Sequence, residues 1–247
     1  MELLVSGTIA FLFAGFIKGV VGFGFPIIAL IVLTLSIGLL EALAIIIVPT
    51  LVTNIWQAMD GPYLRDILRR MWLYFALAMT GILVASRFLT LVNVDWLTGL
   101  LGSVLFFFAV SQLLNFHIVV PPERERPLSV VLGFFNGLLT GFTGSFMVPS
   151  VLYMRALGFG KDMLVQAMGT FFALSTLMLA VSLGSNELLD GQQALASTIA
   201  LIPSFAGIYV GRWTRDQVDE ERFQLLFLCG VLLLGGYIAW RSFTSLA

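Results

Sequence analysis

The chain is dominated by long runs of apolar residues, and these runs constrain its fold more than any other feature. Six of them have about the length that an α-helix needs to cross a hydrocarbon core of about 30 Å. They lie at about 41–58, 71–90, 95–114, 162–184, 192–211 and 222–241. Of the 247 residues, 59% are hydrophobic and only 11% are charged, whereas soluble domains carry about 25% charged residues. The sequence therefore predicts an all-α polytopic membrane protein.

Two further apolar stretches, 3–37 and 128–154, are interrupted by glycine and proline. As a single helix the first would be about 50 Å long, which exceeds the thickness of a bilayer core. Its interruptions are Gly19, Gly22, Gly24 and Pro26, and those of the second are Gly137, Gly141, Gly144 and Pro149. We expect each stretch to form a glycine-broken helical hairpin, called here the first and the second hairpin.

The basic residues indicate how these hairpins cross the membrane, because cytoplasmic loops carry an excess of Lys and Arg. If each hairpin leaves the membrane on the side it entered, ten basic residues lie on one side and only Arg87 and Arg241 on the other. If each crosses once, the count falls to about six against six. We therefore expect both termini in the periplasm; whether the hairpins are re-entrant or fully spanning stays open. The net charge of -1 does not indicate a nucleic-acid partner.

The two hairpins also resemble each other in sequence. Residues 15–19 (Gly-Phe-Ile-Lys-Gly) match residues 133–137 (Gly-Phe-Phe-Asn-Gly), and Gly22-Phe23 matches Gly141-Phe142. Each hairpin is followed by three spans, so the second copy is expected to be inverted in the membrane. We predict a first repeat at 1–116, a cytoplasmic linker at 117–127 and a second repeat at 128–247. Inverted repeats are common among secondary transporters, whose substrates bind where broken helices of the two halves meet.

The interrupted hairpins are the expected binding elements. Backbone N–H groups freed at the start of a half-helix, with the positive end of its dipole, suit an anion. The candidate residues are Gly22, Phe23 and Gly24 in the first hairpin and Thr143, Gly144 and Ser145 in the second. The alternative is close helix packing through small residues.

Polar residues within the apolar stretches complete the candidate set. Lys18 is expected to offset the charge of an anion, the alternative being a snorkelling side chain. Asn54 and Gln57 lie on one polar stripe of the second span, for which interhelical hydrogen bonding is the alternative. Asn136, which matches Lys18 in the repeat, and Ser175 are the further substrate-binding candidates.

The residue types that an enzyme needs are not grouped within the spans. These segments hold no nucleophile beside a base, no paired carboxylates and no His/Glu cluster, and the chain has no Walker-type phosphate loop. Its single cysteine, Cys229, excludes an internal disulfide and a cysteine-built metal site. We expect no enzyme activity, no cofactor and no metal.

Several of these motifs resemble the sulfite exporter TauE/SafE family. The resemblance lies in residues 15–26, 49–57, 137–145 and 162–169 and in Pro149, and the size and loop pattern agree along essentially the whole chain. It implies transport of a sulfur-containing oxyanion, such as sulfite, sulfoacetate or a related organosulfonate, across the bacterial inner membrane.

The sequence thus predicts a secondary transporter that binds a small anion and works by alternating access as its two halves rock. Its partners would be the lipid bilayer, the anion and a coupling ion, H⁺ or Na⁺, if transport is coupled; a homodimer stays open. The alternatives are an anion channel of the same fold, a transporter of another small anion with that fold, and a non-transporting membrane scaffold.

Overall fold

The computed structural model describes residues 2–114, 118–215, 217 and 219–245, and among them every regular element is an α-helix. Apolar side chains on most faces of these segments favour helices, because a helix satisfies its own backbone hydrogen bonds inside a membrane. The helices are α1 (Glu2–Val21), α2 (Phe25–Ile37), α3 (Leu39–Met59), α4 (Leu64–Ser86), α5 (Val94–Leu113), α6 (Pro122–Thr143), α7 (Ser150–Ala156), α8 (Lys161–Ser185), α9 (Gly191–Ile199), α10 (Leu201–Arg215) and α11 (Glu220–Thr244).

Six segments are long and apolar enough to cross a membrane, which confirms the predicted all-α polytopic class. They are Leu39–Met59, Leu64–Ser86, Val94–Leu113, Lys161–Ser185, Gly191–Arg215 and Glu221–Thr244. The fifth consists of two consecutive helices, α9 and α10, which adjoin at Ala200. Pro203 follows closely, and it has no N–H to donate to the carbonyl of Ile199. The expected span at 192–211 is therefore interrupted one turn from its proline.

Both hairpins are broken at their glycines, and each has a long and a short arm. The first break lies between α1 and α2 at residues 22–24, and the second lies between α6 and α7 at residues 144–149. With 20 residues, α1 is about 30 Å long, and the 13 residues of α2 reach about 20 Å. The 7 residues of α7 reach only about 10 Å. Neither second arm is long enough to cross a bilayer core.

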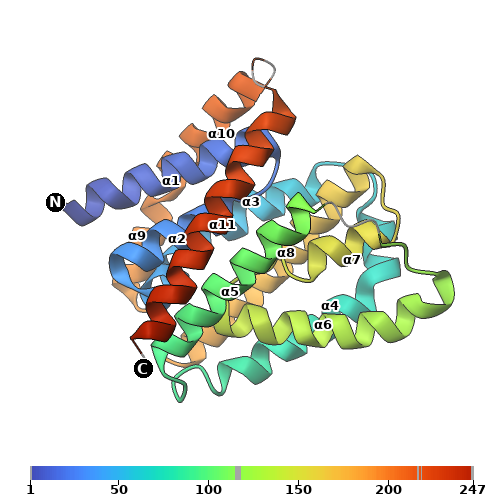
Figure 1. Ribbon diagram of the computed structural model, residues 1–247, viewed down its shortest axis with the longest axis horizontal. Helices are drawn as coiled ribbons and strands as arrows, with labels where there is room; N and C mark the ends of the chain where they lie inside the picture. The colour runs from blue at the N-terminus through green and yellow to red at the C-terminus, as the bar shows by residue number, and fades with distance from the viewer. Residues whose placement is uncertain (1, 115–117, 216, 218, 246–247) are drawn as a thin grey trace. The chain divides into compact units, whose positions relative to one another are not determined.

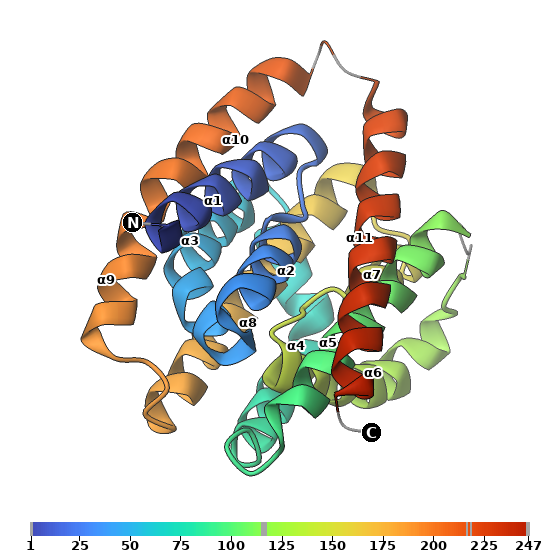
Figure 2. The ribbon, with the colours of Figure 1, turned by 60° about the vertical axis from the view of Figure 1, so that its left-hand side comes forward.

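The chain forms two compact units, and each unit combines parts of both sequence halves. Unit 1 comprises Met1–Pro49, Asn93–Asn115 and Leu188–Ala247, and unit 2 comprises Thr50–Val92 and Phe116–Glu187. Within unit 1, α1 packs along α10 and α5 along α11; within unit 2, α4 packs along α6 (Figure 1). The second view again shows α1 lying along α10, although they are far apart in the sequence (Figure 2).

Small residues bring α1 and α10 into backbone contact in unit 1. A methyl group added at Gly15 would meet the carbonyl oxygen of Ser204, and one added at Gly19 would meet that of Ile208. A methyl group on Gly211 would in turn meet the carbonyl oxygen of Phe16 and the Cα atom of Gly19. Helices in membranes associate through such close packing, since lipid provides no hydrophobic drive between them.

Unit 2 repeats this packing in α6 and α4. Methyl groups added at Gly133 and Gly137 would meet the carbonyl oxygens of Tyr74 and Ala78, and one at Gly81 would meet Phe134 O and the Cα atom of Gly137. The contacting residues of the two units correspond at constant differences in residue number. Each residue of α6 lies 118 positions after its counterpart in α1, and each residue of α4 lies 130 positions before its counterpart in α10. The sequence match between the hairpins thus extends to their packing partners.

Candidate functional site

The first break reverses the chain in unit 1 through a left-handed glycine. Gly24 has φ 97° and forms the N-cap of α2, without a side-chain hydrogen bond. A residue with a Cβ would be strained there. The N–H of Ile28 returns to the carbonyl of Gly24 across 3.1 Å, so helix geometry leaves the N–H groups of Phe25 and Ile27 without an intrahelical acceptor. These groups form the positive end of α2.

Lys18 lies in the last turn of α1, close to this break. Its residue is only 8% exposed, and its carbonyl oxygen accepts the N–H of Gly22 across 2.8 Å. The backbone nitrogen of Arg212 on α10 lies against Gly19, the residue that follows Lys18. Two basic residues and a helix N-terminus therefore belong to the same end of the α1–α10 pair, which favours a negative ligand.

The ring of Phe23 is directed toward α11. It makes an edge-to-face contact with Phe227, with ring centroids 6.3 Å apart, and a methyl group on Gly24 would also meet Phe227. Phe23 thus anchors the break through its side chain, and its part in ligand binding would be limited to its backbone.

The second break, in unit 2, is held by hydroxyl groups. The N–H of Gly144 (φ 69°) donates to Thr140 O across 2.7 Å. Thr143 Oγ1 donates to Leu139 O across 2.6 Å and accepts the N–H of Ser145 across 3.1 Å. Thr140 Oγ1 donates to Ser145 O. Ser145 Oγ is buried and has no hydrogen-bond partner in the described part of the chain, so it is the hydroxyl of this break that remains available to a ligand.

Asn136 lies two turns before the second break, fully buried. Its Nδ2 atom donates to Tyr74 Oη of α4 across 2.7 Å, whereas its Oδ1 atom has no partner among the described residues. The Tyr74 ring stacks on Tyr153 of α7 with centroids 5.2 Å apart, and Tyr153 Oη contacts Ser129 Oγ across 2.8 Å. Tyr74 and Tyr153 were not among the predicted site residues; the sequence signal for them is a hydroxyl group on a residue within an apolar segment.

Two glutamine side chains connect α3 and α8 through hydrogen bonds to the backbone. Gln57 Nε2 donates to Val165 O across 2.9 Å. Gln166 Nε2 donates to Ala58 O and Gly61 O, and its Oε1 atom accepts the N–H of Tyr63. These amides fasten the end of α3 to the start of α8, which is the structural alternative for Gln57.

Asn54 of α3 and Ser175 of α8 are buried polar residues. Asn54 is 1% exposed. Ser175 is fully buried, and its Oγ atom has no partner among the described residues. Phe146 of the second break and Phe172 of α8 have ring centroids 5.8 Å apart, which places the break against α8 one turn before Ser175. Unit 2 therefore brings its break close to one expected polar residue of α8.

The structure groups the candidate residues by unit. Unit 1 holds Lys18 together with Gly22, Phe23 and Gly24; unit 2 holds Asn54, Gln57, Asn136, Thr143, Gly144, Ser145 and Ser175.

Residue 117, at the start of the expected linker, lies outside the described residues, and α6 already begins within this linker at Pro122. No group of three His, Cys, Asp or Glu side chains in the described ranges is placed to hold a metal ion.

The comparison with known proteins agrees with this architecture. The profile of the sulfite exporter TauE/SafE family matches residues 8–238. No curated protein and no solved structure matches the chain.

Proposed function

The chain belongs to the sulfite exporter TauE/SafE family of membrane transporters, and we propose that it is a secondary transporter of a small sulfur-containing oxyanion. The substrate would be sulfite, sulfoacetate or a related organosulfonate, and the membrane would be the bacterial inner membrane. The six apolar spans make the chain a multi-pass membrane protein.

The observation that carries this proposal is the first break. A buried lysine, Lys18, occurs there with the N–H groups at the start of α2, and the backbone of Arg212 lies against the neighbouring Gly19. Lysines within membrane spans are rare and mark substrate or ion pathways. Helix N-termini bind oxyanions through their N–H groups, and a tetrahedral oxyanion could accept several such bonds while Lys18 balances its charge.

The second break supports the same proposal with neutral donors. Ser145 Oγ and Ser175 Oγ are buried hydroxyls without a partner among the described residues. A buried polar atom without a hydrogen-bond partner lowers the stability of the folded protein. A hydroxyl can donate a hydrogen bond to an oxyanion. The equivalent packing of α1–α10 and α6–α4 fits an internal repeat, and we propose that this repeat is inverted and supports alternating access.

Counterflow in proteoliposomes tests the function. Vesicles loaded with unlabelled sulfite or sulfoacetate should accumulate the labelled anion from outside, with an initial rate that saturates with concentration. A current that grows without saturation would favour an anion channel. No anion-dependent flux, together with no thermal stabilisation by any small sulfonate or by sulfite, would favour the scaffold and contradict the proposal.

Imposed gradients then test the coupling ion. A pH gradient or a Na⁺ gradient across the same vesicles should drive uphill accumulation if H⁺ or Na⁺ moves with the anion. Exchange that neither gradient alters would identify a uniporter.

A further inference from the structure

A polar cavity of ≈ 360 Å³ lies in unit 1, where the end of α2, the start of α5 and the end of α11 come together. Asp95 in the first turn of α5 and Arg241 in the last turn of α11 both line it. Neither side chain forms an ion pair with another described residue. The cavity therefore offers one negative and one positive group to a ligand that carries both charges.

The wall of this cavity also contains a buried hydroxyl. Thr34 of α2 is 7% exposed, and its Oγ1 atom has no hydrogen-bond partner among the residues described. Ser242 of α11, likewise buried, lines the same cavity. An unpartnered buried hydroxyl is destabilising, so a polar ligand in this cavity would satisfy Thr34.

The aromatic residues beside the charged pair indicate the level of the cavity in the membrane. Trp96 follows Asp95 and is 55% exposed, and Trp240 precedes Arg241 and is 72% exposed. Tryptophan is enriched where the hydrocarbon core meets the lipid headgroups. The two tryptophans therefore favour a position of the cavity at headgroup depth, at the ends of two helices that are long enough to span.

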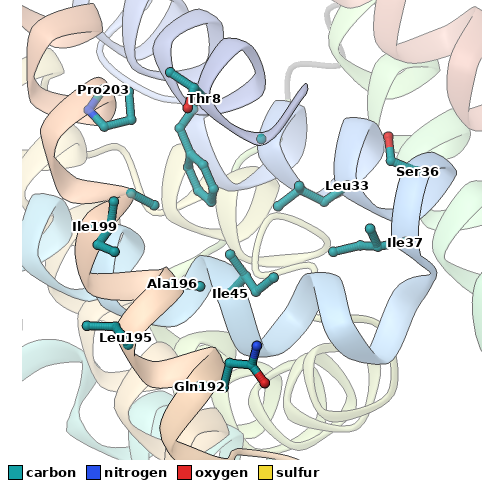
Figure 3. A pocket seen from close by; sticks show the side chains of 13 residues that line it. Thr8, Leu33, Ser36, Ile37, Ile45, Gln192, Leu195, Ala196, Ile199 and Pro203 are labelled. Carbon is teal, nitrogen blue, oxygen red and sulfur yellow. The ribbon is translucent and has the colours of Figure 1, made fainter. Parts of the chain in front are cut away.

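A second, apolar cavity of ≈ 290 Å³ shares one wall residue, Ser36 of α2, with the polar one. Figure 3 shows Leu33 and Ile37 of α2 on one side of it and Leu195 and Ile199 of α9 on the other. Both cavities lie within unit 1. The polar and the apolar cavity thus have Ser36 as their common wall residue.

We propose that these two cavities bind one phospholipid whose headgroup carries a primary ammonium, as in phosphatidylethanolamine. Arg241 donates to the phosphate, because a guanidinium pairs well with a phosphate oxygen. Asp95 accepts hydrogen bonds from the ammonium, which has three N–H donors. An acyl chain fills the apolar cavity beyond Ser36. This lipid site is separate from the first break and does not depend on the proposed transport.

Lipid-dependent thermal stability of the purified full chain tests the proposal. Phosphatidylethanolamine should raise the melting temperature more than phosphatidylcholine, whose quaternary ammonium has no N–H, and more than phosphatidylglycerol, which has no cation. Native mass spectrometry should detect the retained lipid. We expect Arg241→Gln to weaken retention of phosphatidylethanolamine about tenfold, as for the loss of one charge-assisted hydrogen bond. Arg87→Gln, which changes an exposed arginine at the C-cap of α4, should leave retention unchanged.

Asp95→Asn provides a second measurement that does not depend on the folding of the Arg241 variant. It should remove the preference for phosphatidylethanolamine over phosphatidylcholine and leave phosphatidylglycerol binding as in the wild type. Equal stabilisation by all three lipids would overturn the proposal, as would an unchanged preference in both variants. Stabilisation by soluble phosphoethanolamine equal to that by the lipid would assign the polar cavity to a free zwitterion instead.

Discussion

Ser197 of α9 donates its hydroxyl proton to the carbonyl oxygen of Ile45 in α3 across 2.7 Å. Pro49 lies four residues after Ile45 inside α3, and because proline has no N–H, this carbonyl has lost its helical partner. The same Oγ atom accepts the N–H of Val48 across 3.0 Å. One side chain, 149 residues from Val48, thus satisfies the backbone groups beside the proline of α3.

Replacement of Ser197 should destabilise unit 1. Ser197→Ala leaves the buried carbonyl of Ile45 without its partner, and we expect the free energy of unfolding to fall by about 1–3 kcal/mol. Thr198 is exposed and bonds only within its own helix, so Thr198→Ala should change stability by less than about 0.5 kcal/mol. Denaturation in detergent compares the two variants, and equal losses would contradict the assigned role of Ser197.

The glycine contacts predict a matched pair of destabilising substitutions. Gly211→Ala and Gly81→Ala each place a methyl group against the backbone of the facing helix, and we expect each to lose about 1–3 kcal/mol of stability. Gly230 of α11 has open space around the corresponding methyl position. Gly230→Ala should be neutral or stabilising by up to about 1 kcal/mol, since alanine favours a helix. A tolerated Gly81→Ala beside a destabilising Gly211→Ala would argue against equivalent packing in the two units.

Lys18 predicts the effect of charge on transport. Lys18→Met keeps most of the length of the side chain and its apolar character but removes the cation. We expect the counterflow rate to fall about tenfold or more, and the thermal stabilisation by sulfite or sulfoacetate to fall by more than half. Arg87→Gln serves as the control, because this exposed arginine lies at the C-cap of α4. Full ligand stabilisation of Lys18→Met would refute the countercharge role and assign the lysine to structure.

The buried hydrogen bond between Asn136 and Tyr74 is expected to contribute to the stability of unit 2. Tyr74→Phe removes the oxygen that accepts the Asn136 amide proton, and we expect a loss of about 1–3 kcal/mol in stability. Adding Asn136→Leu should recover part of this loss, because an apolar pair leaves no unsatisfied donor. Thermal unfolding of the single and double variants measures the coupling, and strictly additive losses would mean that the hydrogen bond contributes nothing.

The charge count predicts the topology of the termini. Reporter fusions at the N- and C-terminus should both report a periplasmic position, as expected if each hairpin returns to the side it entered. A cytoplasmic N-terminus with a periplasmic C-terminus would break the argument for an inverted repeat. Reversal of both together would instead invalidate the count of basic residues.

The local features of this fold were predictable because residues that are neighbours in the sequence determine them. Six apolar runs predicted six spans, and the glycines at positions 22, 24 and 144 predicted the breaks. The interruption at Ala200 was missed, although Pro203 provides its signal. The candidate site was predictable only in part: the sequence marks Lys18 and Ser145 as polar residues in apolar surroundings, but not which of their atoms are already bonded.

Contacts between residues far apart in the chain could not be predicted from the sequence and depended on the tertiary structure. The sequence alone determined which segments are helical and apolar and where they break, since hydropathy, glycine and proline act over one or two turns. Only the folded structure decided that α1 packs on α10 and α4 on α6, that Tyr74 accepts from Asn136, and that Ser197 satisfies Ile45. In a membrane every helix is apolar on most faces, so hydropathy cannot select partners; close backbone approach and single hydrogen bonds do.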